Sequence, residues 1–276
     1  MSLSLNVFQT AFGTYSRLLP SHAAARAVKL MTSPRISAER RQSSRALFDD
    51  VVVLKGDALL SMYGRGQKTM LVLHGWSGWI GQFNDLLSEV DPNEYTVYAL
   101  HPLGHGESKA AESHPGRFIE AVMDAHDHVG RSFDVAIGHS LGAAALIYVE
   151  AVQPCFERLV LVSGPATIEG VLNRFARFVN LGEKSRRLFI RNMEMKVGLD
   201  IDRLDLLSLA PSISKPTLLV HDERDREIPV DEAGSLNQVF PKSRLVRTAG
   251  YGHSRLLQRP EVIQEILEFI AVSQRR

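Results

Sequence analysis

The stretch from Phe133 to Val149 limits most narrowly the folds that this chain can adopt. It opens with a short apolar run that is typical of a strand buried on both faces, and it closes with good helix formers. Between them lies Gly138-His139-Ser140-Leu141-Gly142, the pattern Gly-x-Ser-x-Gly. A chain that passes from strand to helix in so few residues turns sharply, and the flanking glycines remove Cβ atoms that would clash there. The stretch therefore predicts a strand, a tight turn and a helix.

Ser140 is the candidate nucleophile. The turn would hold its hydroxyl at the exposed carboxyl edge of a sheet, in front of a helix N-terminus. The helix dipole there favours the negative charge that develops during attack on a carbonyl. A glycine-flanked turn with a capping serine has the same five residues, but the strand before it and the helix after it favour a nucleophile.

Strand-like and helical patterns alternate along most of the chain, which indicates a mostly parallel sheet with helices on both faces. The expected strands are residues 46–54, 58–63, 69–73, 95–100, 135–137, 159–162, 216–220 and 244–247. The first two are joined at Lys55-Gly56-Asp57, which is a hairpin signal. The expected helices are residues 82–90, 117–131, 143–149 and 230–239, with a last helix from Pro260 onward.

Two segments interrupt this alternation. Residues 1–45 form an N-terminal extension with two amphipathic helical patterns and no acidic residue before Glu39. Such a segment can be a transit peptide or can contact a membrane surface through residues 1–35, but a pair of packed helices is the favoured interpretation. Residues 167–213 show helical patterns without a clear strand. We expect them to form a helical lid inserted into a domain of residues 46–276.

Composition excludes several classes of protein. The chain has 276 residues, with 32 Lys and Arg against 31 Asp and Glu, so no bulk charge points to nucleic acid. Cys155 is the single cysteine, which excludes an internal disulfide and is compatible with a cytoplasmic protein. No apolar run approaches the length of a membrane span. The oligomeric state is not indicated.

A serine hydroxyl needs a base to take its proton, and the base needs an acid to orient it. Ser140, Asp225 and His253 occur in this order, each in a loop directly after an expected strand. Together with Gly-His-Ser-Leu-Gly, this arrangement closely resembles the α/β-hydrolase fold superfamily, and in particular its serine esterases and lipases, over roughly residues 46–276. The resemblance implies an eight-stranded, mostly parallel sheet with helices on both faces and a helical lid.

The same resemblance assigns the base and the acid. The family's histidine commonly follows a glycine in the last loop, as in Gly252-His253. Its acid is commonly the last residue of His-Gly-x-x-Asp, which here reads His221-Asp222-Glu223-Arg224-Asp225. Asp222 stands where the family usually has glycine, so two carboxylates follow one strand. Asp225 lies farther into the loop and is the expected acid, whereas Asp222 is expected to form a turn.

Two further loops resemble family motifs. His74-Gly75-Trp76 resembles the family's oxyanion loop, which implies that the backbone N–H groups of Trp76 and Leu141 hold the oxyanion. Residues 101–108 resemble Asp-x-x-Gly-x-Gly-x-Ser, with His101 in place of the aspartate. We interpret the histidines of this second loop as structural.

The expected activity is hydrolysis of carboxylic esters through an acyl-enzyme on Ser140, without a metal or an organic cofactor. The partner is a small-molecule ester with an apolar acyl or aryl group. The candidate substrate-binding residues are His74, Gly75, Trp79, Phe175 and Phe178. Thioesters, amides, lactones and carbon–carbon bonds remain open as substrates, because the same triad serves them all. A ligand-binding protein that keeps the fold without turnover is the alternative from another class.

Overall fold

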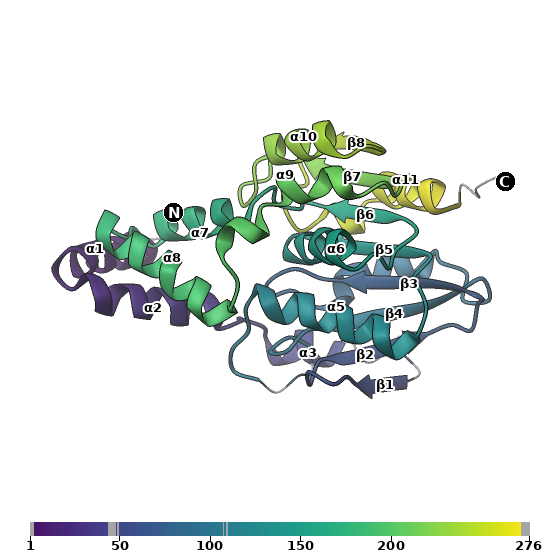
Figure 1. Ribbon diagram of the computed structural model, residues 1–276, viewed down its shortest axis with the longest axis horizontal. Helices are drawn as coiled ribbons and strands as arrows, with labels where there is room; N and C mark the ends of the chain where they lie inside the picture. The colour runs from purple at the N-terminus through teal and green to yellow at the C-terminus, as the bar shows by residue number, and fades with distance from the viewer. Residues whose placement is uncertain (1–2, 44–47, 49, 107, 109, 272–276) are drawn as a thin grey trace. The chain divides into compact units, whose positions relative to one another are not determined.

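The computed structural model describes residues 3–43, 48, 50–106, 108 and 110–271 (Figure 1). These residues form two compact units. The larger lies within Pro34–Ala166 and Leu206–Arg276, and the smaller lies within Met1–Ser33 and Thr167–Asp205. Each unit therefore joins stretches that are far apart in the sequence.

An eight-stranded sheet of described residues is the centre of the larger unit (Figure 1). Its strands are β1 (Asp50–Val53), β2 (Leu59–Tyr63), β3 (Lys68–Leu73), β4 (Tyr95–His101), β5 (Val135–His139), β6 (Leu159–Val162), β7 (Thr217–Asp222) and β8 (Ser243–Thr248). Their order is β1-β2-β4-β3-β5-β6-β7-β8. The β1–β2 and β2–β4 pairs are antiparallel and the other pairs are parallel. The predicted mostly parallel sheet is confirmed.

Burial explains the composition of the central strands. Every residue of β5, β6 and β7 is buried. A strand covered on both faces has no solvent side, so it reads as an apolar run instead of an alternating pattern. The edge strand β8 has no buried residue and carries exposed arginines.

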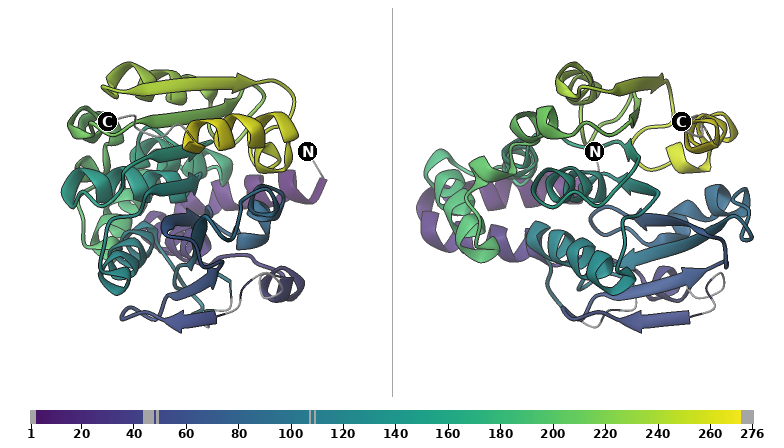
Figure 2. Two further views of the ribbon diagram at one scale, coloured as in Figure 1. Left: turned by 90° about the vertical axis from the view of Figure 1, so that its right-hand side faces the viewer. Right: turned by 45° about the vertical axis from the view of Figure 1, so that its right-hand side comes forward.

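Helices cover both faces of this sheet (Figure 2), with α5, α6 and α10 on one face and α4 and α11 on the other. The α-helices of the unit are α3 (Ala38–Ser43), α4 (Asn84–Ser88), α5 (Pro115–Val129), α6 (Leu141–Val152), α9 (Leu206–Leu209), α10 (Val230–Val239) and α11 (Pro260–Ala271). Short 3₁₀ segments are η2 (Ile80–Phe83), η4 (Ala210–Ser212) and η5 (Leu256–Gln258). The inner face of α11 presents Val262, Ile263 and Ile266 to a core that also contains β3 and β5 residues.

The smaller unit is helical. It contains α1 (Leu3–Leu18), α2 (Pro20–Thr32), α7 (Ile168–Phe178), α8 (Glu183–Val197) and the 3₁₀ segment η3 (Ile201–Leu204). Helix α2 packs along α8, and its Ala23, Ala24 and Ala27 are fully buried. Ser16 ties α1 to the start of α8, because its Oγ accepts the N–H of Gly182 at 2.9 Å and its carbonyl accepts the Ser185 hydroxyl at 2.6 Å. No helix in the described ranges is both long and apolar enough to cross a membrane.

The structure draws the internal boundaries differently from the sequence interpretation. It groups residues 1–33 with residues 167–205, whereas the patterns suggested a separate extension and a separate insertion. Residues 206–212, expected in the insertion, form α9 and η4 in the larger unit, where both pack against α6. The start of the expected strand at Ala46 lies outside the described residues, and β1 begins at Asp50. The expected helix 82–90 is shorter, because η2 precedes it and α4 ends at Ser88.

Candidate active site

Ser140 stands at a strained turn between β5 and α6. Its φ is 54° and its ψ is −119°, a conformation that L-residues rarely adopt and that costs about 1–3 kcal/mol. The turn is held by its own backbone, since the Ser140 N–H donates to the Val162 carbonyl at 2.8 Å and its carbonyl accepts from Ala144 at 3.2 Å. The predicted turn between strand and helix is present.

The two glycines of the motif are required by close backbone approach. A Cβ on Gly138 would lie 2.7 Å from the Ala143 Cα, and a Cβ on Gly142 would lie 2.4 Å from the Leu73 carbonyl oxygen. Side chains at these positions would push α6 away from the ends of β5 and β3. The glycines therefore let the helix begin directly behind Ser140.

His253 and Asp225 are paired. The Nδ1 of His253 is 2.7 Å from the Oδ2 of Asp225, whose carboxylate is completely buried. The other oxygen of Asp225 accepts the N–H groups of Glu227 and Ile228 at 2.8 and 3.0 Å. Burial by itself raises the pKa of Asp225, but hydrogen bonds from His221 and His253 outweigh burial and hold the pKa below its ordinary range. The residue at the expected acid position is thus an ionised carboxylate facing His253.

Asp222 contacts a different set of atoms. Its side chain is fully buried and accepts hydrogen bonds from the N–H groups of Arg224, Gly250, Tyr251 and Gly252 and from the hydroxyl of Thr248. Burial raises the pKa of Asp222, but these bonds, those from Tyr251 and Gly252 foremost, lower it to about 2. Asp222 therefore joins the loop after β7 to the loop that carries His253, and it makes no contact with the imidazole of His253 in the described structure.

The backbone of His253 is held next to the residue that precedes Ser140. The carbonyl of His253 accepts a hydrogen bond from Nε2 of His139 at 2.8 Å and one from the Ser163 hydroxyl at 3.3 Å. The two imidazole rings have centroids 4.9 Å apart. Burial lowers the pKa of His139 to about 3, so this ring is neutral at physiological pH. His139 and Ser163 had no motif that pointed to this contact, since only the tertiary fold brings the last loop to them.

The Ser140 hydroxyl makes no hydrogen bond to His253 in the described part of the chain. Nε2 of His253 faces the Glu227 carboxylate at 3.8 Å. Catalytic hydrogen bonds are often long in enzymes without substrate and shorten in the complex. The structure thus joins Asp225 to His253 directly, and it brings Ser140 to this pair through its neighbour His139.

The backbone after β3 lies against Ser140. A Cβ on Gly75 would fall 2.7 Å from the Cβ of Ser140. In the described structure the N–H of Trp76 has no acceptor, and the N–H of Leu141 belongs to the first turn of α6, where no intrahelical acceptor exists. Two backbone donors are therefore free on the two segments that the family resemblance assigned to the oxyanion hole.

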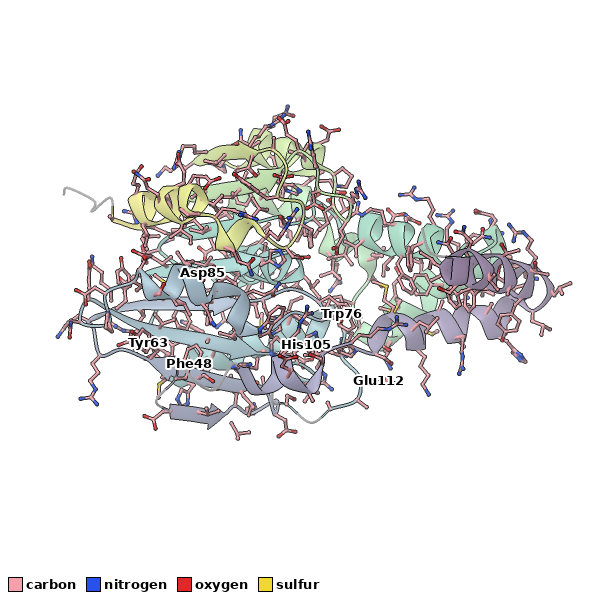
Figure 3. All side chains as sticks on the ribbon, turned by 180° about the vertical axis from the view of Figure 1, so that it is seen from behind. Phe48, Tyr63, Trp76, Asp85, His105 and Glu112 are labelled. Carbon is pink, nitrogen blue, oxygen red and sulfur yellow. The ribbon has the colours of Figure 1, made fainter. Side chains whose placement is uncertain are left out.

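A buried aromatic cluster supports this backbone. Figure 3 shows Trp76 beside His105, and the two ring centroids are 5.1 Å apart. Nε2 of His105 accepts the N–H of Ser77 at 3.0 Å, so this nitrogen carries no proton. His74 and Phe118 lie 5.3 and 5.0 Å from the same ring. His105, from the loop of residues 101–108, thus orders the segment that follows Trp76. From the sequence alone, this histidine is interpreted only as structural.

The remaining candidate substrate-binding residues lie in different environments. The ring of Trp79 is covered by the Arg40 guanidinium, whose Cζ is 4.3 Å from the ring centroid. Phe175 and Phe178 belong to the helical unit, where the Phe175 ring lies 5.6 Å from that of Phe189 and Phe178 is 52% exposed. His74 is fully buried, and burial lowers its pKa to about 4. Among the described residues, no three His, Cys, Asp or Glu side chains are grouped so that they could hold a metal ion.

The fold and these residues define a class of protein. The sequence model of the Alpha/beta hydrolase family matches residues 70–265, and the chain belongs to this family. The resemblance seen in the motifs is thereby confirmed.

Similar proteins include esterases and lipases. A pimeloyl-(acyl-carrier protein) methyl ester esterase of Xanthomonas axonopodis pv. citri is 22% identical over 253 residues, 77% of this chain and 98% of that protein. A monoacylglycerol lipase of Mycolicibacterium smegmatis is 24% identical over 204 residues, 60% of this chain and 72% of that protein. The crystal structure of a bacterial membrane phospholipase A superposes with a TM-score of 0.62 at 20% identity, covering 86% of this chain and 91% of that one.

Proposed function

We propose that the chain is a serine hydrolase that cleaves carboxylic esters. The observation that carries this proposal is the strained Ser140 at the β5–α6 turn, in a unit where the buried Asp225 carboxylate pairs with His253. Backbone strain at a turn that its surroundings hold in place is typical of a functional position. The names of the relatives, an ester esterase and a lipase, favour an ester over the other bonds that such a triad can cleave.

The proposed chemistry begins with attack of Ser140 Oγ on the acyl carbon. Nε2 of His253 takes the hydroxyl proton, and Asp225 stabilises the imidazolium through Nδ1. The N–H groups of Trp76 and Leu141 stabilise the oxyanion of the tetrahedral intermediate. His253 then protonates the leaving alcohol, and water, deprotonated by the same histidine, releases the acid from the acyl-enzyme.

Active-site labelling and turnover test the proposal together. A fluorophosphonate should label the wild-type chain at Ser140, and p-nitrophenyl esters should be hydrolysed with release of the acid. Ser140→Ala should abolish labelling and lower kcat by on the order of 10⁴ to 10⁶, with an unchanged circular dichroism spectrum, because alanine supplies no nucleophile. Retention of more than about a tenth of wild-type kcat would eliminate Ser140 as the nucleophile, since acid–base help alone exceeds that.

A further inference from the structure

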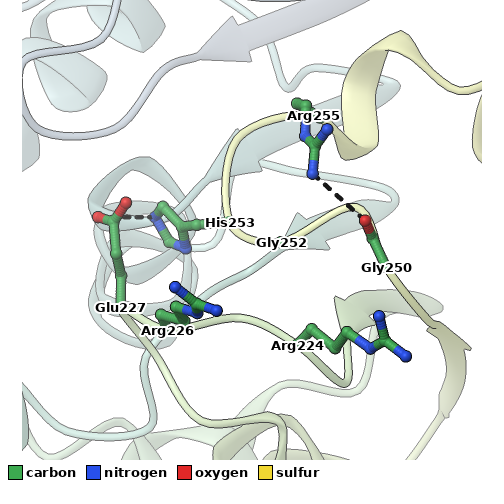
Figure 4. Close-up of a pocket in the computed structure, with 7 residues that line it drawn as sticks. All are labelled: Arg224, Arg226, Glu227, Gly250, Gly252, His253 and Arg255. Carbon is green, nitrogen blue, oxygen red and sulfur yellow. Dashed lines mark hydrogen bonds and ion pairs between the residues drawn. The ribbon is translucent and has the colours of Figure 1, made fainter.

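A cavity of about 460 Å³ lies beside His253 in the larger unit (Figure 4). Its walls come from the loop between β7 and α10 and from the loop between β8 and η5. Cavities of about 300–1,000 Å³ are typical of sites that hold small molecules. The proposed reaction assigns a role to His253 among the lining residues, but it assigns none to the cavity itself.

The cavity is lined by three arginines, Arg224, Arg226 and Arg255. Within the described chain, none of them forms an ion pair with a carboxylate, and the side chains of Arg224 and Arg226 make no hydrogen bond. The Arg255 guanidinium is anchored to the His253 loop, since Nε donates to the Tyr251 carbonyl at 2.9 Å and Nη2 to the Gly250 carbonyl at 3.3 Å. Guanidinium groups stay protonated in proteins, so the cavity carries three permanent positive charges.

Glu227 is the one acidic side chain in the lining. Its carboxylate faces Nε2 of His253 at 3.8 Å (Figure 4), and among the described residues it forms no ion pair with an arginine. The three arginines are exposed, so solvent and salt weaken their mutual repulsion, and an anion between them offsets what remains. Arginine is also the side chain best suited to carboxylate and phosphate, because its planar N–H groups can donate two parallel hydrogen bonds to such an anion.

We propose that this cavity binds an anionic group of the ester substrate, a carboxylate or a phosphate, and that Arg224, Arg226 and Arg255 select esters that carry one. The inference rests on the proposed function. Because His253 is part of the wall, a bound anion lies next to the proposed catalytic base, and we assign it to the molecule being cleaved instead of to a distant effector. The arginines are then specificity determinants of the hydrolysis.

Two matched pairs of esters test the selection and distinguish the two anions. Mono-p-nitrophenyl glutarate and p-nitrophenyl pentanoate share a five-carbon acyl chain and differ in a terminal carboxylate. The second pair, 1-butyrylglycerol 3-phosphate and 1-butyrylglycerol, differs in a phosphate. For each pair the quantity measured is the ratio of kcat/KM for the anionic ester to that for the neutral ester, after subtraction of spontaneous hydrolysis.

Arg224→Gln, Arg226→Gln, Arg255→Gln and the triple variant should each lower the ratio in at least one pair, by about two- to fivefold per arginine that donates to the anion, because all three arginines are exposed. The wild-type ratio should also fall as NaCl is raised, because salt screens partly exposed charges. Arg65→Gln is the control. It removes the same charge from an exposed residue at the amino end of β3, the opposite edge of the sheet from Ser140, and should leave both ratios unchanged.

Equal ratios for the wild type and the triple variant in both pairs would overturn the inference. The three arginines would then be solvated side chains with no role in selecting the substrate. Arg224 and Arg226 make no side-chain hydrogen bonds in the described structure, so their variants test selection even where Arg255→Gln loosens the loop.

Binding of glutarate and glycerol 3-phosphate to the Ser140→Ala protein, with and without the three arginines, is measured in parallel. Arginine-dependent binding without turnover of any ester by the wild type would support the anion site and reject the proposed function. Turnover of esters without arginine-dependent binding of either anion would support the proposed function and reject the anion site.

Discussion

Asp222 and Asp225 are three residues apart but have different hydrogen-bond partners. Asp225 reaches the imidazole of His253, while the described partners of Asp222 are backbone N–H groups and one hydroxyl. The difference follows from position, because Asp222 is the last residue of β7 and points its side chain at the neighbouring loop. Asp225 lies beyond the strand, where the chain has turned and its carboxylate lies beside the imidazole of His253.

Replacement of each aspartate by asparagine should therefore give different losses. Asp225→Asn should lower kcat by about 10⁴, since an amide opposite Nδ1 favours the wrong tautomer of His253. It should destabilise the fold less than the change at Asp222, because the amide oxygen can still accept the N–H groups of Glu227 and Ile228. Asp222→Asn should lower the free energy of unfolding by about 3 kcal/mol, because an NH₂ group would meet N–H donors in a buried site. Steady-state kinetics with urea unfolding separates the two. A loss of 10⁴ in kcat for Asp222→Asn without destabilisation would move the acid to Asp222.

At the scale of elements, the turn after β5 and the helix pair α2–α8 show two ways in which small residues allow close packing. At the turn, Gly142 lets α6 meet the end of β3. In the helical unit, the buried alanines of α2 let this helix pack along α8. In both cases the absence of side-chain volume decides which elements can touch.

A leucine at Ala24 tests the second case. Ala24 is fully buried, and the added methyl groups should overpack the helical unit at a cost of about 1–3 kcal/mol. Amide hydrogen exchange in α8 (Glu183–Val197) should then become faster by about fivefold or more, since each 1.4 kcal/mol is a factor of ten in an opening equilibrium.

Ala25→Leu is the control, because Ala25 is exposed on the same helix. It should leave exchange in α8 nearly unchanged. Equal exchange rates in α8 for the wild type and Ala24→Leu would contradict the packing of α2 on α8. They would show that the stability of α8 does not depend on α2.

For the whole molecule, three buried histidines connect pH to stability. Burial lowers the pKa of His74 to about 4 and those of His101 and His139 to about 3. Their pKa in the unfolded chain is about 6.5, so below that pH the unfolded state binds more protons than the folded state. Stability is then complete above about pH 6.5 and falls as the solution is acidified toward the folded pKa values.

Urea unfolding at pH 7.5, 6.0 and 5.0 measures this loss. The free energy of unfolding should decrease below pH 6.5 with a slope approaching about 1.4 kcal/mol per pH unit for each buried histidine. His101→Asn removes one of the three buried histidines and should reduce the slope by up to about 1.4 kcal/mol per pH unit. His128→Gln, at an exposed position of α5, should leave the slope unchanged. A stability that stays constant from pH 7.5 to 5.0 would show that these rings do not resist protonation in the folded state.

Local patterns in the sequence were enough to predict the sheet, most of its strands and the turn at Ser140. A buried strand must be apolar along its length, and a strand–turn–helix step needs glycine where backbones meet, so both leave marks within a few residues. The family resemblance then marked Asp225, His253, Trp76 and Leu141, each at a strand end or turn that a short motif identifies.

Contacts between distant segments were decided only in three dimensions. The pairing of residues 1–33 with residues 167–205, the hydrogen bond from His139 to the His253 carbonyl and the three arginines around one cavity join residues far apart in the chain. No periodicity records such contacts, because periodicity reports which face of an element is buried and not what covers it. What covers each face is settled by packing, where volume, burial and hydrogen bonding across the whole chain must be satisfied at once.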